Sequence, residues 1–154
     1  WDVDSAAKTA VRKKEKAEVQ GIGFRYQSGM LIITLPSGRE LFYAKPRIEE
    51  NRFGGESITY EGVGTGKRWE RIETYGAKLV ENIVQAISRD ILCNALMTFK
   101  YSDIVMHVHD EIVIEADPRM SVQAVCEQMS RTPKWAKGLK LDADGFTCSF
   151  YQKD

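Results

Sequence analysis

The sequence predicts an α+β fold in which an antiparallel sheet packs on one long helix and a small antiparallel β insertion is added. Apolar residues recur at helical spacing between Ile72 and Met97. Short apolar runs separated by Pro, Gly or Asn fill residues 22–60, and another pair of short apolar runs occupies 104–108 and 111–115. Because strands follow strands, rather than alternating with helices, antiparallel pairing is favoured.

Residues 1–20 have the pattern of a helix. Asp4 or Ser5 can cap its start, and Gly21 ends it. The small apolar residues that share one face of this helix are Val3, Ala6, Ala7, Ala10 and Val11.

Basic residues gather in the second half of this predicted helix, at Lys13, Lys14 and Lys16. They form either an ordinary solvated helix face or a stripe that contacts nucleic-acid phosphates.

Residues 22–60 are expected to form the small antiparallel insertion. Residues 30–35 and 40–43 predict a hairpin around a connection that contains Pro and Gly. Further strands are expected at 24–26 and 56–60, with an acidic, Gly-rich loop at 49–55 between them. No catalytic constellation is visible in this region.

Residues 62–67 resemble a phosphate-binding P-loop only superficially. The P-loop pattern requires a Gly five positions before the Gly-Lys pair and a Ser or Thr after the Lys. Glu61 and Arg68 stand at those positions. We therefore interpret the segment as a connector.

The long helix is predicted from about Ile72 to Met97, which corresponds to roughly 40 Å at 1.5 Å per residue. The width of its apolar stripe predicts burial along much of its length. Arg71, Tyr75 and Lys78, near its start, are expected to share one face. Its apolar residues at about four-residue intervals are Leu79, Ile83, Ile87, Ile91, Ala95 and Phe99.

After the hairpin of residues 104–115, a shorter helix is expected. Pro118, with Asp117 ahead of it as a cap, would open this helix, and it would end near Ser130. Apolar and polar residues alternate between 139 and 151, which predicts one or two final strands.

Composition limits the classes of function. The chain has 154 residues, with 22 basic and 22 acidic side chains and no formal net charge. Free-standing nucleic-acid-binding domains are usually basic, so contact with DNA would be confined to local patches. The sequence predicts no membrane span and no secretory signal. Because the chain begins at Trp1 rather than Met, we expect an excised piece of a longer protein.

Three cysteines, Cys93, Cys126 and Cys148, are widely spaced and never form a Cys-x-x-Cys pair. This spacing argues against a zinc ribbon or a disulfide framework and favours a reducing, cytoplasmic compartment.

The residues with the clearest chemical potential lie at the tip of the 104–115 hairpin. Tight hairpin turns favour Asn-Gly or Asp-Gly, but His109 and Asp110 stand there, followed by a second acid, Glu111. Local rules are often broken at functional sites, and carboxylates suit magnesium. The alternative is a polar hairpin end that simply faces solvent.

Two metal sites are conceivable at this tip. Imidazoles suit zinc, so His107, His109 and Asp110 could belong to a transition-metal hydrolase. A two-magnesium site needs more carboxylates than Asp110 and Glu111 supply. On either interpretation the set of ligands looks incomplete.

The segment Val108–Glu111, between two apolar strands and before a short helix, resembles motif C of the family A DNA polymerases. Residues 69–86 and 133–139 resemble the phage and prophage branch of that family. The resemblance implies that Asp110 is a magnesium ligand, that Glu111 assists at the metal site and that His109 lies near the primer terminus.

The same resemblance implies that Arg71 contacts DNA near the active site. Tyr75 and Leu79 stand at the spacings where polymerase I has an Asn and a Gln that read the minor groove. Because of this departure, Tyr75, Lys78 and Gln85 are only candidates for DNA binding.

Motif A, with the other metal-binding aspartate, and motif B, which grips the incoming triphosphate, are not found in these residues. The resemblance therefore implies a C-terminal fragment. Residues 69–154 would be part of the palm, and residues 1–68 a helix with a branch-specific β insertion. Missing segments with motifs A and B would be its partners, and exposed apolar surface could lead to self-association.

By the same resemblance, the full enzyme would use two Mg²⁺ ions to join dNTPs to primer–template DNA in a bacterial or phage-infected cell. The isolated fragment is expected to be inactive. A non-catalytic, nucleic-acid-binding replication accessory domain is the alternative.

Overall fold

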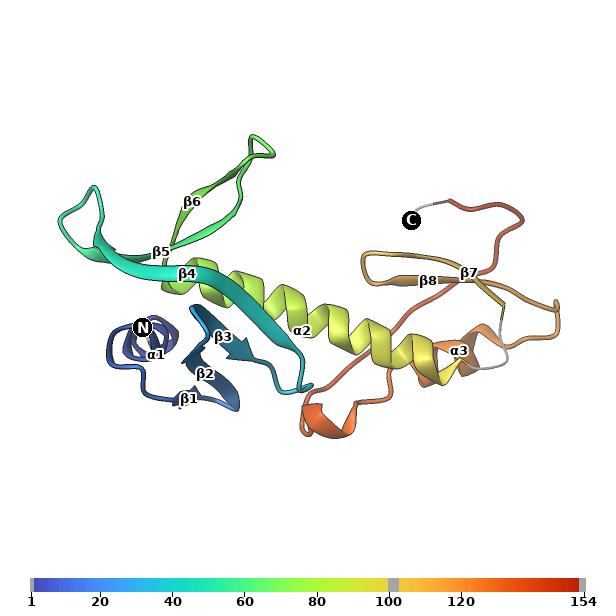
Figure 1. Cartoon of the computed structure of the whole chain (residues 1–154). Helices are drawn as coiled ribbons and strands as arrows, with labels where there is room; N and C mark the ends of the chain where they lie inside the picture. The colour runs from blue at the N-terminus through green and yellow to red at the C-terminus, as the bar shows by residue number, and fades with distance from the viewer. Residues whose placement is uncertain (1, 100–102, 153–154) are drawn as a thin grey trace. The chain divides into compact units, whose positions relative to one another are not determined.

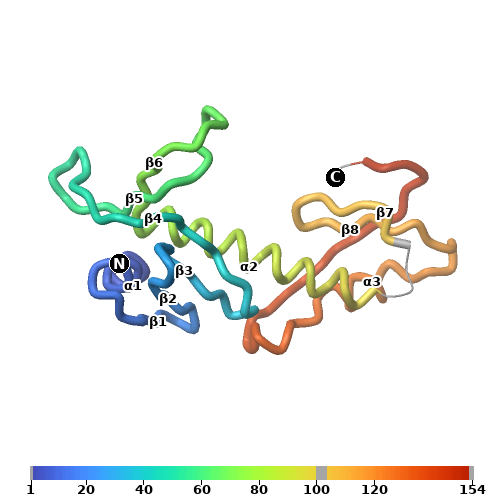
Figure 2. Tube along the Cα trace, viewed as in Figure 1, coloured from blue at the N-terminus to red at the C-terminus, as the bar shows by residue number. Residues whose placement is uncertain are grey.

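The computed structural model describes residues 2–99 and 103–152 (Figures 1 and 2). The chain divides into two compact units, Trp1–Ile87 and Ser88–Asp154. The first is called unit 1 and the second unit 2. The α+β fold class is confirmed, since a six-stranded antiparallel sheet, a two-stranded sheet and a long helix are all present.

Unit 1 consists of helix α1 (Asp2–Lys13), six strands and the start of helix α2 (Gly76–Thr98). Every strand pairs with the next strand along the chain, so the sheet order is β1-β2-β3-β4-β5-β6 (Figure 1). The strands are β1 (Ala17–Val19), β2 (Ile22–Gln27), β3 (Met30–Thr34), β4 (Glu40–Glu50), β5 (Glu56–Val63) and β6 (Trp69–Thr74).

The core of unit 1 lies between α1, the sheet and the first turns of α2. Alternation along β2 and β3 directs Phe24, Leu31 and Ile33 inward, and each is at most 1% exposed. Leu79 and Ile83 of α2 complete the same cluster. The face of α1 that meets them consists of small side chains, which let the helix lie close to the sheet, namely Ala6, Ala7, Ala10 and Val11.

Turn chemistry explains the meander. β1 and β2 are joined at Gln20-Gly21, and β2 and β3 at Ser28-Gly29. Both residues of each pair have positive φ, as a type I′ turn requires. Farther along, the register of β4 against β5 shifts between Ala44 and Arg47.

Unit 2 contains the remainder of α2, a two-stranded hairpin and a short helix. The hairpin pairs β7 (Asp103–Val108) with β8 (Glu111–Glu115), with a register shift between Ile104 and Met106. Helix α3 (Val122–Met129) follows, and then a 3-10 turn, Lys134–Ala136. Among the described residues of unit 2, the buried apolar side chains are those of Leu92, Ala95 and Phe99, from α2 or directly after it, and of Pro133.

The predicted hairpins at 30–43 and 104–115 are confirmed, as are strands at 24–26 and 56–60. The prediction of a helix over residues 1–20 is wrong beyond Lys13, because residues 17–19 pair with β2 as an edge strand.

The long helix begins at Gly76, not at Ile72, because residues 69–74 pair with β5 as strand β6. Its broad apolar face is not buried throughout. Val80 is 42% exposed and Val84 is 55% exposed, while Leu79 and Ile83 on the neighbouring face are buried.

Two predictions for the end of the chain are also wrong. Ser121 caps α3 by accepting a hydrogen bond from the N–H of Ala124, whereas Asp117 binds Arg119 outside the helix. No strand forms between Leu139 and Tyr151, where Phe150 is 70% exposed. An alternating sequence forms a strand only when a neighbouring edge supplies hydrogen-bond partners, and no described strand does so here.

No described helix has the length and apolar character needed to cross a membrane.

Candidate functional site

The tip of the β7–β8 hairpin is a two-residue loop. Val108 pairs with Glu111, which leaves His109 and Asp110 as the loop residues. His109 has a φ of +51°, whereas Asp110 is not among the residues with positive φ. This is the φ pattern of a type II′ turn, whose first loop position favours Gly. The unusual turn chemistry seen in the sequence therefore holds His109 in a left-handed conformation.

The two acidic side chains at this tip differ in their surroundings. Asp110 is exposed, while Glu111 is partly buried and its Oε2 accepts a 3.3 Å hydrogen bond from the Tyr151 hydroxyl. Partial desolvation of the hydroxyl, followed by the negative charge of Glu111, raises the pKa of Tyr151. Tyr151 thus orients Glu111, and Asp110 faces solvent.

The donor atoms of Asp110 and Glu111 are carboxylate oxygens, which magnesium prefers. Their chemistry fits a hard cation, but the other ligands must come from elsewhere. Within residues 2–99 and 103–152, no three His, Cys, Asp or Glu side chains gather to hold a metal ion. His107 instead places Nδ1 3.3 Å from Nη1 of Arg89. The described residues therefore do not assemble the ligand set His107, His109 and Asp110 that a transition-metal hydrolase would need.

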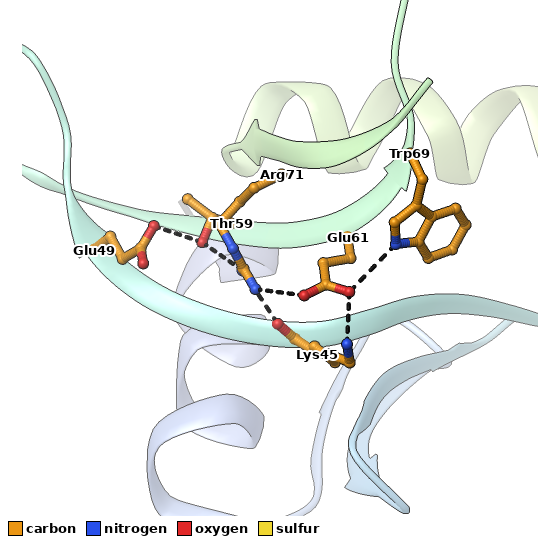
Figure 3. Close-up of polar contacts among 6 residues, drawn as sticks. All are labelled: Lys45, Glu49, Thr59, Glu61, Trp69 and Arg71. Carbon is orange, nitrogen blue, oxygen red and sulfur yellow. Dashed lines mark hydrogen bonds and ion pairs between the residues drawn. The ribbon is translucent and has the colours of Figure 1, made fainter. Parts of the chain in front are cut away.

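Arg71 lies on strand β6 and donates to groups within the sheet (Figure 3). Its Nη1 is 3.2 Å from the carbonyl oxygen of Lys45 and 3.0 Å from Oγ1 of Thr59. Its Nη2 is 3.3 Å from Oε1 of Glu61. The expectation that Arg71 shares a helix face with Tyr75 and Lys78 is wrong, because strand pairing with β5 takes the segment out of the helix.

Two of the remaining candidates on α2, Lys78 and Gln85, share the carboxylate of Glu81 as a hydrogen-bond partner. Lys78 donates to Oε2 of Glu81 at 2.8 Å, and Gln85 donates to Oε1 of Glu81 at 3.3 Å. The hydrogen bond from Lys78 to Glu81 is the main reason that the pKa of Lys78 is raised. Tyr75 precedes the helix and is 55% exposed. Lys78 and Gln85 therefore lie together on an exposed part of the helix surface.

The three lysines at the end of α1 do not form one helical stripe. Lys14 has a φ of +60°, donates to the carbonyl oxygen of Val11 at 2.6 Å and lies 3.2 Å above the Tyr26 ring. It therefore closes the C-terminus of α1. Lys13 and Lys16, on either side of this closing turn, are exposed.

A polar network centred on Glu61 lies on the same face of the sheet as Arg71 (Figure 3). Oε2 of Glu61 accepts from Nζ of Lys45 at 2.8 Å and from the indole Nε1 of Trp69 at 3.3 Å. The hydrogen bond from Lys45, and then that from Trp69, lowers the pKa of Glu61. The run Lys67-Arg68-Trp69 was the signal in the sequence for a basic, aromatic surface here.

Comparison with known proteins confirms the resemblance to a phage DNA polymerase. The whole chain aligns over 159 residues, at 46% identity, with a protein of Bacillus phage SP02 named DNA polymerase. The chain spans only 24% of the length of that relative. No family model matches the chain, and no solved structure matches it.

Proposed function

We propose that the chain is the C-terminal palm portion of a phage-type DNA-directed DNA polymerase of family A. The observation that carries this proposal is the 46% identity along the whole chain to part of the SP02 polymerase. The acidic β7–β8 tip adds support, because Asp110 stands exposed on a two-residue loop directly before Glu111. Residues 69–154 would belong to the palm, and residues 1–68 would be the helix and β insertion.

In the complete enzyme, Asp110 would bind magnesium directly, with Glu111 beside it as an electrostatic or water-mediated neighbour. Two magnesium ions bound there would stabilise charge on the attacking and departing oxygens during deoxynucleotidyl transfer. His109 would lie near the primer terminus, and Tyr151 would keep Glu111 in position through its hydrogen bond.

The partners of the complete enzyme would be primer–template DNA and dNTPs. Lys13, Lys16, Lys78, Gln85 and Tyr75 would be available for contacts with DNA, since each lies at the surface or in a surface ion pair. Arg71 and Lys14 would act on DNA only indirectly, because their donors already bind groups within unit 1.

The isolated chain would lack polymerase activity. Asp110 and Glu111 supply two carboxylates, and the aspartate expected of motif A is not found in the sequence. The missing polymerase segments, with motifs A and B, would complete the site in the cytoplasm of a bacterial or phage-infected cell. Exposed Val80 and Val84 on α2 would favour contact with those segments, or self-association without them.

The test uses the parent protein that contains this chain. Asp110→Asn should reduce primer extension by at least about a hundredfold, since it removes a direct carboxylate ligand of the proposed magnesium ions rather than a group that only orients one. Affinity for primer–template DNA should change little. Glu115→Gln is the matched control, because Glu115 is an exposed acid at the opposite end of β8.

Undiminished extension by Asp110→Asn would refute the catalytic assignment and favour the non-catalytic accessory domain. Templated extension by the 154-residue chain alone would refute the prediction that it is inactive.

A further inference from the structure

Two hairpins of unit 1 use the same three-residue loop. In each, the last loop residue donates its N–H back to the carbonyl oxygen before the loop. These bonds join Gly38 to Leu35 at 2.9 Å and Gly54 to Asn51 at 3.0 Å. Gly38 has a φ of +88° and Gly54 a φ of +77°. Glycine at this left-handed position is the usual solution for a three-residue hairpin loop.

The β5–β6 hairpin has the same loop but a different residue at the left-handed position. The N–H of Lys67 donates to the carbonyl oxygen of Gly64 at 3.0 Å, and the N–H of Gly64 donates to that of Arg68 at 3.0 Å. Lys67 has a φ of +54°. A residue with a Cβ is strained in this conformation, so the tip carries a cation where Gly would be more stable.

The charge on this tip is accessible. Lys67 and Arg68 are exposed, and neither has an ion-pair partner among the described residues. Glu70, the nearest acid in the sequence, lies with its carboxylate over Gly64, so the tip carries one negative charge against two positive charges. Figures 1 and 2 show the end of the hairpin clear of α1 and of strands β1–β3.

An exposed aromatic side chain, Trp69, directly follows the two cations in the sequence. Trp69 is 65% exposed, and its cross-strand neighbour Val63 is 64% exposed. The hydrogen bond from the indole Nε1 to Glu61 holds one edge of the Trp69 ring (Figure 3). A held ring with exposed area next to cations has the composition of a single-strand binding surface, where a base stacks and phosphates meet positive charge.

The tip of the β4–β5 hairpin provides an internal comparison. It also presents an aromatic and a cation, since Phe53 is 81% exposed and Arg52 lies 4.7 Å from its ring centroid. However, acids flank that loop at Glu49, Glu50 and Glu56. Its local charge is therefore unfavourable for a polyanion, and its left-handed position holds Gly54 without strain.

We propose that the β5–β6 tip binds single-stranded DNA, with Lys67 and Arg68 against phosphates and Trp69 stacked on a base. An unpaired strand is favoured over a duplex, because only an unpaired base offers its face to the ring. The inference rests on the proposed function in one respect, the choice of DNA as the polyanion.

The test measures binding of a fluorescein-labelled oligo(dT) to the 154-residue chain by anisotropy at several salt concentrations. Lys67→Gly should weaken binding and reduce the slope of log affinity against log salt by about 0.7, the value for one lost phosphate contact on a single strand. It should leave the melting temperature equal or higher, since the left-handed strain is relieved. If Lys67 had only a structural role, Lys67→Gly would not weaken binding while leaving the melting temperature equal or higher.

Trp69→Ala should weaken binding about tenfold, from the loss of one stacked base. Phe53→Ala, at the other tip, should leave affinity unchanged. Equal affinity of Lys67→Gly and the unsubstituted chain would overturn the inference, as would equal effects of Trp69→Ala and Phe53→Ala. Failure of the unsubstituted chain to bind at low salt would also overturn it.

These outcomes are separable from the proposed function. Asp110→Asn should bind oligo(dT) as the unsubstituted chain does, although it strongly reduces extension by the parent protein. If the tip variants bind oligo(dT) as the unsubstituted chain does while extension still depends on Asp110, the inference about the tip fails and the proposed function stands.

Discussion

The guanidinium Nη1 of Arg71 lies 3.2 Å from the carbonyl oxygen of Lys45, at the point where β4 changes register against β5. Lys45 has a φ of +45°, and Pro46 follows it. An irregular strand position leaves backbone groups without their usual ladder partners. Arg71, from β6, supplies the missing donor across β5 and joins three strands (Figure 3).

Arg71→Ala should therefore lower the free energy of unfolding of the chain by about 1–3 kcal/mol, since partly buried acceptors lose a charged donor. Urea denaturation followed by circular dichroism measures this change. Lys78→Ala is the control, because it removes an exposed ion pair to Glu81 that contributes about 0–1 kcal/mol. An unchanged midpoint for Arg71→Ala would show that Arg71 is free to serve DNA instead.

Acid should weaken the same network through Glu61. The hydrogen bonds from Lys45 and then Trp69 place the pKa of folded Glu61 below its ordinary value of 4.5. The stability that this carboxylate contributes is complete above pH 4.5 and is lost as the pH falls through the lower folded value. Melting temperatures of Glu61→Gln and the unsubstituted chain should differ at pH 7, and the difference should shrink as the pH falls below 4.5. A difference that grows in acid would contradict this assignment.

Gly76→Ala should destabilise the chain, although Ala favours helices. A Cβ at Gly76 would lie 2.8 Å from Cβ of Asp4, so α1 or α2 must shift, at a cost of about 1–3 kcal/mol. Gly66→Ala is the matched control, since a Cβ there meets no heavy atom within 4 Å. Thermal unfolding of the two variants gives the comparison. A gain in stability for Gly76→Ala would mean that helix propensity outweighs this contact.

The turn at His109 should distinguish Gly from β-branched residues. Because His109 has a φ of +51°, His109→Gly should be more stable than His109→Val by about 1–2 kcal/mol. Hydrogen exchange of the β7–β8 amides measures the opening free energy of this hairpin in each variant. Equal protection in the two variants would argue that the loop adopts another turn in solution.

Hairpins whose turn residues lie between two apolar runs were the most predictable elements, whereas strand β1 of the β1–β2 hairpin was expected to be part of a helix. The turn residues Pro36 and Gly38 lie between two apolar runs, and the local chemistry of Pro and Gly favours a loop there. Strand β6 was missed because Trp69–Thr74 contains residues that both helices and strands accept. Pairing with β5 makes this segment a strand rather than a helix, and the local sequence does not identify that partner.

The candidate site was predictable where local turn chemistry determines it, and not where it depends on contacts between distant residues. His109 and Asp110 drew attention because they replace favoured turn residues, and the φ of His109 confirms that the turn is unusual. The hydrogen bond between Tyr151 and Glu111 joins residues far apart in the chain, so no spacing rule predicts it. The spacing of Arg71 from Tyr75 suits a helix, and its contacts with Lys45 and Thr59 across the sheet depend on strand partners that spacing does not show.

The uninterrupted strand order of unit 1 has a consequence for synthesis on the ribosome. Each strand from β2 to β6 pairs with the strand immediately before it in the chain, so the sheet can assemble progressively as the nascent polypeptide emerges. Only short loops need to close at each addition, which keeps the entropic barrier low. The unpaired edge of each newly formed strand would then be covered by the next strand within seconds of its synthesis, which limits pairing with another molecule.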